Sequence, residues 1–109
     1  EKGVELFINA RTDLFLQNGA EAHEGLMEDA LARAAAYRAA GADGFFVPGL
    51  RDAALIARIC TEQGMPVNIM RKGQEIADLA ALGVARISHG PAPFVVAMQA
   101  VKEAAQELY

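Results

Sequence analysis

Apolar residues follow a repeating pattern along this chain, in which a short unbroken run is followed by a longer segment with helical spacing. The first run covers residues 4–10 and is apolar apart from Glu5 and Asn9, which is typical of a strand buried on both faces. Residues 26–40 then place apolar side chains at helical spacing in an alanine-rich segment. Gly41 follows, where glycine commonly ends a helix. We therefore expect a strand and then a helix here.

The same succession recurs three more times. Asp52 stands where an N-cap residue would begin the second helix, and Gly64 and Gly83, like Gly41, each precede a strand by about two residues. Strands joined through helices in this way are parallel, with right-handed crossovers. The further elements expected are a strand over 44–47, helix Ala53–Glu62, strand Pro66–Met70, helix Gln74–Leu82, strand Val84–Ser88 and helix Pro93–Leu108.

Four βα units make half of an eight-stranded α/β barrel or the core of a small open sheet. An open sheet usually carries a glycine-rich phosphate turn after its first strand, whereas this chain continues with INARTD over residues 8–13. The pattern therefore favours the half-barrel, with residues 1–109 as a single partial domain. A complete barrel needs roughly 250 residues. Because Glu1 is not an initiator Met and the first strand begins almost at once, we expect a longer natural chain.

Composition excludes several classes of protein. With 53% hydrophobic and 22% charged residues the chain is globular, and a net charge of −4 without any run of Lys and Arg predicts no nucleic-acid partner. Cys60 is the single cysteine, which suits a reducing compartment. No apolar run approaches the roughly 18 residues of a membrane span, and residues 1–20 do not resemble a signal peptide. We expect a cytoplasmic protein without a membrane partner.

Polar residues gather where the predicted strands end, and in barrels this edge carries the active site. Arg11 ends an otherwise apolar strand, so its planar guanidinium could hold a substrate carboxylate through two hydrogen bonds. The alternative is a structural ion pair of Arg11 with Asp13 or Glu5. Arg11 is thus a candidate for both roles.

Asn68 and His89 are the other two candidates. Asn68 alternates with Ile69 along its strand, so it could face the barrel lumen and donate to a substrate oxygen, or it could bond a neighbouring strand end. His89 follows the fourth strand and could bind an anion or transfer a proton near neutral pH. Its alternative is a loop histidine bonded to the backbone.

Other polar and reactive residues receive structural interpretations. We expect His23 to be exposed in a polar loop, and Cys60 to pack within a helix without chemistry of its own. The segment SHGPAPF over residues 88–94 could offer a helix N-terminus to phosphate, although two prolines remove donors. The acidic residues interpreted as solvated helix faces are Glu24, Glu28, Asp29, Glu103 and Glu107.

Four segments, INARTD, AGADGFFVPGL, PVN and LGVARISHGP, together resemble the isocitrate lyase/phosphoenolpyruvate mutase superfamily over almost the whole chain. The resemblance implies the second, C-terminal half of that family's TIM barrel. It also implies a Mg²⁺-dependent enzyme that cleaves or forms a C–C or P–C bond of a small 2-oxo or 2-hydroxy carboxylic acid through a pyruvate-type enolate. Members of the family are typically tetramers that exchange a C-terminal helix, so a homo-oligomer is expected.

The resemblance assigns roles residue by residue. Arg11 matches the arginine that grips the substrate carboxylate and steadies the enolate oxygen, and Asn68 matches a substrate-side position. His89 is similar to the histidine that the oxaloacetate decarboxylase-like branch places beside the substrate. Thr12 and Asp13 are expected to orient Arg11.

Two departures from the family pattern bear on these roles. Pro48-Gly49 stands where the isocitrate and methylisocitrate lyases have Pro-Glu, which favours the decarboxylase-like or an uncharacterised branch. The family's acidic Mg²⁺ ligands and its gating loop belong to the first half of the barrel, so we expect no metal ligand in this chain and no activity from it alone. Two other hypotheses stay open: a non-catalytic, self-assembling half-barrel, and a phosphate-binding barrel enzyme using the Ser88–Pro91 turn.

Overall fold

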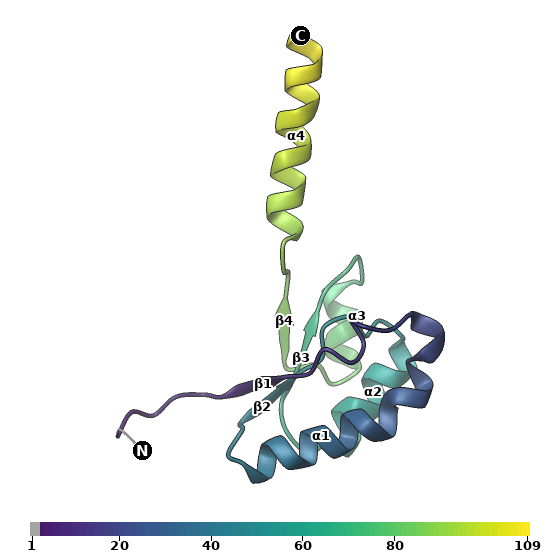
Figure 1. Cartoon of the computed structure of the whole chain (residues 1–109), viewed down its shortest axis with the longest axis vertical. Helices are drawn as coiled ribbons and strands as arrows, with labels where there is room; N and C mark the ends of the chain where they lie inside the picture. Colours follow the sequence, from purple (N-terminus) through teal and green to yellow (C-terminus); the bar gives the residue numbers. More distant parts are fainter. Residues whose placement is uncertain (1–2) are drawn as a thin grey trace.

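The computed structural model describes residues 3–109, in which four short strands alternate with helices (Figure 1). The strands pair in the order β1-β2-β3-β4, and every pairing is parallel. This confirms the predicted succession of βα units. The elements are β1 Asn9–Arg11, the 3₁₀ turns η1 Ala20–Ala22 and η2 Glu24–Leu26, α1 Met27–Ala39, β2 Gly44–Phe46, α2 Ala53–Glu62, β3 Val67–Met70, α3 Ile76–Ala81, β4 Arg86–Ser88 and α4 Ala92–Leu108.

Local signals account for most of the helix ends. The Asp52 carboxylate accepts a hydrogen bond from the Leu55 backbone N–H at 3.0 Å, which confirms the predicted cap of α2. Gly41, Gly64 and Gly83 all have positive φ, the conformation in which glycine ends a helix most easily.

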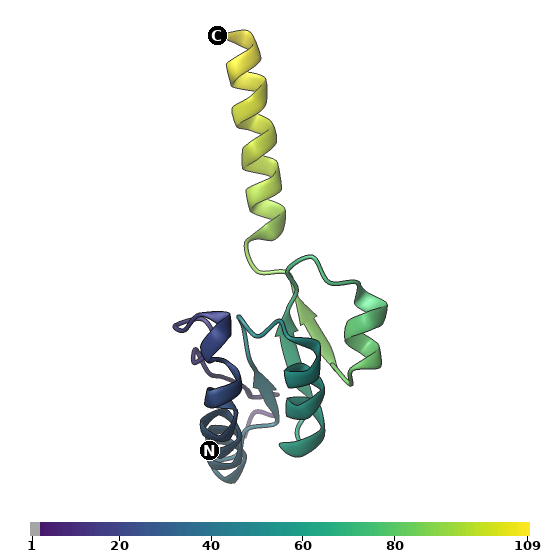
Figure 2. The ribbon, with the colours of Figure 1, turned by 90° about the vertical axis from the view of Figure 1, so that its right-hand side faces the viewer.

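The sheet has two unlike faces because side chains alternate along each strand. The helices α1, α2 and α3 cover one face of the sheet (Figure 2). Phe45, Val67 and Ile69 point to that face, and all three are buried. These helices contribute buried residues such as Ala34 and Ile59 to the same core. The core therefore lies between the sheet and its helices, and the opposite face carries the polar residues.

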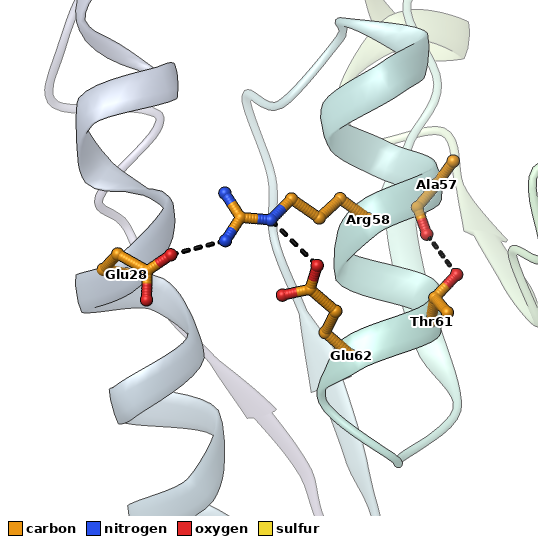
Figure 3. Close-up of polar contacts among 5 residues, drawn as sticks. All are labelled: Glu28, Ala57, Arg58, Thr61 and Glu62. Carbon is orange, nitrogen blue, oxygen red and sulfur yellow. Dashed lines mark hydrogen bonds and ion pairs between the residues drawn. The ribbon is translucent and has the colours of Figure 1, made fainter.

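An ion-pair network joins α1 to α2 outside this core (Figure 3). Arg58 donates from Nε to Glu62 at 3.0 Å within α2, and from its terminal nitrogen to Glu28 of α1. These hydrogen bonds, to Glu62 first and then Glu28, raise the pKa of Arg58. These ion pairs are solvent-exposed, so they contribute little to the stability of the fold.

The first predicted strand is shorter than expected. Residues 4–8 are extended but lie outside β1, and the apolar side chains Val4, Leu6, Phe7 and Ile8 are exposed. Within the described residues, no element covers this segment on the side away from β2. The prediction of a strand buried on both faces is therefore wrong for 4–8 of this chain, because burial needs a neighbour that residues 3–109 do not supply.

The last helix stands away from the rest of the fold. In both views α4 projects beyond the carboxyl end of β4, and all its residues are exposed (Figures 1 and 2). Pro91 precedes the helix, which begins at Ala92, one residue before the predicted start. Its exposed apolar residues include Phe94, Val95, Val96, Met98 and Val101.

Candidate active site

Arg11 lies at the carboxyl end of β1 and is held by two neighbours. Its Nε donates to Oδ1 of Asp13 at 2.6 Å, and its Cζ lies 5.5 Å from the centroid of the Phe46 ring. Arg11 and Asp13 are about half exposed, at 51% and 45% of their side-chain area. The ion pair with Asp13 that the sequence offered as an alternative is therefore present, whereas no ion pair joins Arg11 to Glu5 in residues 3–109.

The ion pair leaves part of the guanidinium free. Only Nε of Arg11 bonds to Asp13, and within residues 3–109 neither terminal nitrogen of Arg11 has a hydrogen-bond partner. Two parallel N–H groups are the arrangement that matches a carboxylate. The Asp13 pair is thus compatible with anion binding by the same arginine.

Thr12 does not orient Arg11 by direct contact. Its side chain is buried, and its Oγ1 accepts a hydrogen bond from the Arg33 guanidinium of α1 at 3.3 Å. Its backbone N–H donates to the Phe46 carbonyl at 3.1 Å, beyond the last paired residue of β1. Successive strand residues point to opposite faces, so Thr12 faces the helices while Arg11 and Asp13 face away from them. The expectation that Thr12 helps to orient Arg11 stays a prediction.

Asn68 is buried at 3% exposure on the same face as Arg11. Its Oδ1 accepts a hydrogen bond from the Ser88 hydroxyl of β4 at 3.2 Å, so the bond to a neighbouring strand exists. Its Nδ2 has no protein acceptor among residues 3–109 and could still donate to a ligand. Phe46 lies between Arg11 and Asn68, paired in register with both.

His89 is exposed in the turn between β4 and α4. Its backbone carbonyl accepts from the Ala92 N–H at 3.2 Å, but its ring has no hydrogen-bond partner in the part of the chain described. The alternative of a loop histidine held through its ring by the backbone is therefore not what the structure contains. His89 directly follows Ser88, so it lies at the same carboxyl edge as Arg11.

His23 is buried, with 5% of its surface exposed, which contradicts the expected solvent position. Its Nε2 lies 3.0 Å from the Phe15 carbonyl oxygen and 2.9 Å from that of Asn18. Both oxygens are acceptors, so Nε2 carries the hydrogen. The ring also meets Phe15 edge to face at 5.1 Å. A polar stretch of sequence gave no sign of this, because the partners are backbone atoms brought round by the loop.

A hollow of about 470 Å³ opens beside this loop. The hollow is not lined by Arg11, Asn68 or His89, so it is separate from the sheet face that carries Arg11 and Asn68. Its lining includes Phe15, His23, Gly49, Arg51, Asp52 and Lys72.

The described residues do not gather the side chains of a metal site. Among residues 3–109, no three His, Cys, Asp or Glu side chains come close enough to share an ion. Asp13, the acidic residue nearest the candidate site in sequence, has its carboxylate engaged by Arg11. The expectation that Mg²⁺ ligands belong to another part of the barrel stays a prediction.

Cys60 packs against the core, and burial raises the pKa of its thiol, in keeping with a structural role.

Among the helices of residues 3–109, none combines the length and apolar character needed to cross a bilayer.

Comparison with known sequences finds a matching family model and several relatives. The family model described as phosphoenolpyruvate phosphomutase matches residues 1–109. An uncharacterized protein of Mycobacterium tuberculosis is 37% identical over 108 residues, which are 97% of this chain and 40% of that protein. The oxaloacetate decarboxylase of Ectopseudomonas mendocina is 33% identical over 106 residues, covering 92% of this chain and 37% of that enzyme.

Solved structures agree with these matches. A Burkholderia cenocepacia protein provisionally named a phosphonomutase superposes with a TM-score of 0.91 at 50% identity, over 98% of this chain and 44% of that one. A second protein of the same organism, provisionally named a lyase/mutase, has a TM-score of 0.81 at 37% identity, over 94% and 36%. The predicted fold class, half of a TIM barrel, is confirmed. The chain spans about 40% of the length of the curated relatives it matches.

Proposed function

The chain belongs to the phosphoenolpyruvate phosphomutase family, and from that premise we propose that it forms part of a lyase or phosphonomutase-like enzyme. The proposed reaction cleaves or forms a C–C or P–C bond of a small 2-oxo or 2-hydroxy carboxylic acid through a pyruvate-type enolate. The observation that carries the proposal is Arg11, which ends β1 with Nε held by Asp13 and with no partner among residues 3–109 at either terminal nitrogen, so both can bind an anion.

In this proposal Arg11 binds the substrate carboxylate and stabilises the negative charge that grows on the enolate oxygen. Asn68 donates from Nδ2 to a substrate oxygen, since its Oδ1 is already used by Ser88. His89 binds a second carboxylate or transfers a proton, because its ring is exposed and has no hydrogen-bond partner among residues 3–109. When bound, Mg²⁺ would polarise the substrate carbonyl, and we propose that its acidic ligands come from the other half of the barrel, since no cluster of three such side chains lies among residues 3–109.

The similarity to oxaloacetate decarboxylases supports oxaloacetate as the first substrate to test. The first measurement is the intact mass of the native gene product, which is compared with the 11.6 kDa of this chain. A mass more than twice as large would lead directly to an assay of Mg²⁺-dependent pyruvate release from oxaloacetate and related acids. We expect 109 residues alone to be inactive.

Arg11→Ala in the native enzyme is the decisive variant. We expect turnover to be lost while the melting temperature stays within about 2 °C, because an exposed ion pair contributes little to stability. Full activity of this variant would remove Arg11 from the mechanism and the proposal with it.

A self-assembling half-barrel without catalysis is the second candidate function. It is favoured by the exposed apolar segment 4–8 beside β1 and by the exposed apolar residues of α4. Light scattering of the native product measures its assembly state, and we propose a homo-oligomer in either case. A native mass equal to that of this chain, with no binding of oxalate, would support the second candidate. Competition with the substrate by phosphate but not by oxalate would instead point to a phosphate site at the Ser88–Pro91 turn.

We also propose a cytoplasmic location.

A further inference from the structure

The sheet face that carries the proposed site has an aromatic residue at its centre. Phe46 of β2 is paired in register with Arg11 of β1 and with Asn68 of β3. Paired residues of parallel strands point to the same face, so these three side chains form one row across the sheet. Phe45 and Val47 point to the opposite face and belong to the buried core.

The Phe46 ring and the Asp13 carboxylate hold the Arg11 guanidinium from two directions. The Cζ of Arg11 lies 5.5 Å from the centre of the ring, within the range of about 6 Å in which a cation is attracted to an aromatic face. Asp13 accepts from Nε at 2.6 Å. The carboxylate fixes the Nε edge of the group, and the ring restricts how its plane can turn.

This restriction matters because Arg11 is half exposed. A free arginine side chain loses rotamer entropy when it binds an anion, and a side chain already held in place loses less. With Nε engaged, a carboxylate can be held through two bonds by the two terminal nitrogens together. The ring thus acts on binding through the arginine.

We propose that Phe46 is a positioning residue, whose ring holds the Arg11 guanidinium with its two terminal nitrogens presented to a substrate carboxylate. The proposal rests on the carboxylate-binding role of Arg11 in the proposed function. Burial of Phe46 as such does not explain the arrangement, because its ring is only half-buried and faces away from the core.

The test is the affinity of the native enzyme for oxalate, measured by calorimetry with Mg²⁺ present. Phe46→Leu keeps an apolar side chain but removes the ring, and we expect the Kd to rise about 2- to 30-fold, the range of a cation–π contact. Phe46→Tyr keeps the ring, so its Kd should stay within about twofold of wild type. A Phe46→Leu Kd equal to that of wild type, or an equal loss in Phe46→Tyr, would overturn the proposal.

Phe7→Leu is the matched control. Phe7 lies on the same face of the sheet as Arg11. Its ring lies over Gly44, since a Cβ added to that glycine would come within 2.8 Å of Cε1 of the ring. Gly44 is one row away from the row that contains Arg11. The same substitution there should leave the oxalate Kd within about twofold, and a melting curve of each variant reports any loss of folding. A loss of affinity as large in Phe7→Leu as in Phe46→Leu would show a general effect of removing a ring and contradict the proposal.

A second measurement separates this proposal from the proposed function. Aromatic rings shift nearby NMR signals, so the side-chain resonances of Arg11 should carry a ring-current shift in wild type and Phe46→Tyr that disappears in Phe46→Leu. Absence of oxalate binding in wild type would contradict the role of Arg11, while the shift still reports whether Phe46 holds it. An Arg11 signal unchanged by Phe46→Leu would overturn the positioning role whatever the substrate.

Discussion

The Asp13 carboxylate accepts a hydrogen bond from Nε of Arg11 at 2.6 Å, two residues along the chain at the end of β1. Both side chains are about half exposed, so the pair contributes on the order of 0–1 kcal/mol to folding. Its consequence is geometric: the Nε edge of the guanidinium is held, and the terminal nitrogens have no partner among residues 3–109.

Replacing Asp13 with Ala therefore tests orientation more than stability. We expect turnover of the native enzyme to fall about tenfold, because partners that orient a binding group typically matter by that order. The unfolding free energy should change by less than about 1 kcal/mol.

Glu62→Ala is a suitable control for that variant. Glu62 forms a comparable exposed ion pair, with Arg58 at 3.0 Å, at the end of α2 that leads into the start of β3 and so away from the carboxyl ends of the strands. Its turnover should equal that of wild type. Equal activity in both variants would show that Asp13 does not orient Arg11.

His23→Ala should destabilise the fold. The substitution leaves the Phe15 and Asn18 carbonyls without their donor and opens space beside the Phe15 ring. An unpaired buried polar group costs about 1–3 kcal/mol, so urea unfolding should shift by that amount. His89→Ala, the same change at an exposed ring, should stay within about 0.5 kcal/mol. Equal midpoints for the two variants would contradict the buried role of His23.

Gly49→Ala is expected to disturb the loop after β2. Gly49 has a φ of +91°, and an added Cβ would lie 2.8–2.9 Å from the backbone of Phe15 and Leu16. Backbone atoms cannot move aside cheaply, so we expect a loss of at least about 1–2 kcal/mol, measured by thermal unfolding. Gly25→Ala meets nothing within 4 Å and should be neutral. A melting temperature unchanged by Gly49→Ala would exclude the tight approach of these two loops.

The Cys60 thiol should react slowly with alkylating reagents, and it should make the free energy of unfolding fall as the pH becomes alkaline. Burial raises its pKa in the folded state, so the folded chain holds the proton more tightly than the unfolded chain does. Its contribution is complete below the unfolded pKa, about 8.5, and is lost as the pH rises through the folded pKa. Urea unfolding between pH 7 and 10 measures this loss, and Cys60→Ala should lack that part of it. Identical pH slopes, or rapid alkylation at pH 7, would contradict the assignment.

Local sequence patterns predict most of the fold. The helix over residues 53–62 was predicted to the residue, because its Asp52 cap and amphipathic spacing lie within the segment itself. The parallel order followed from strands separated by helices, since such connections have one favoured hand. The helix expected over residues 74–82 is shorter, because Gln74 makes other hydrogen bonds before α3 begins. Its side-chain oxygen accepts from the Lys72 backbone N–H, and its backbone carbonyl accepts from the Arg71 side chain.

The candidate site was predictable only in part. Strand ends identify Arg11, Asn68 and His89, because the carboxyl ends of parallel strands share one edge. Phe46 gave no signal in an apolar run, since its importance comes from the register that places it beside Arg11.

What the sequence by itself determined is where helices and strands form, which residues end them, and that the strands run parallel. Those properties depend on periodicity, caps and glycines within a few residues of each other. Only the tertiary structure decided that His23 is buried, that residues 4–8 are exposed, and that Phe46 meets Arg11. Burial and contact depend on partners distant in the chain, so no local pattern can specify them.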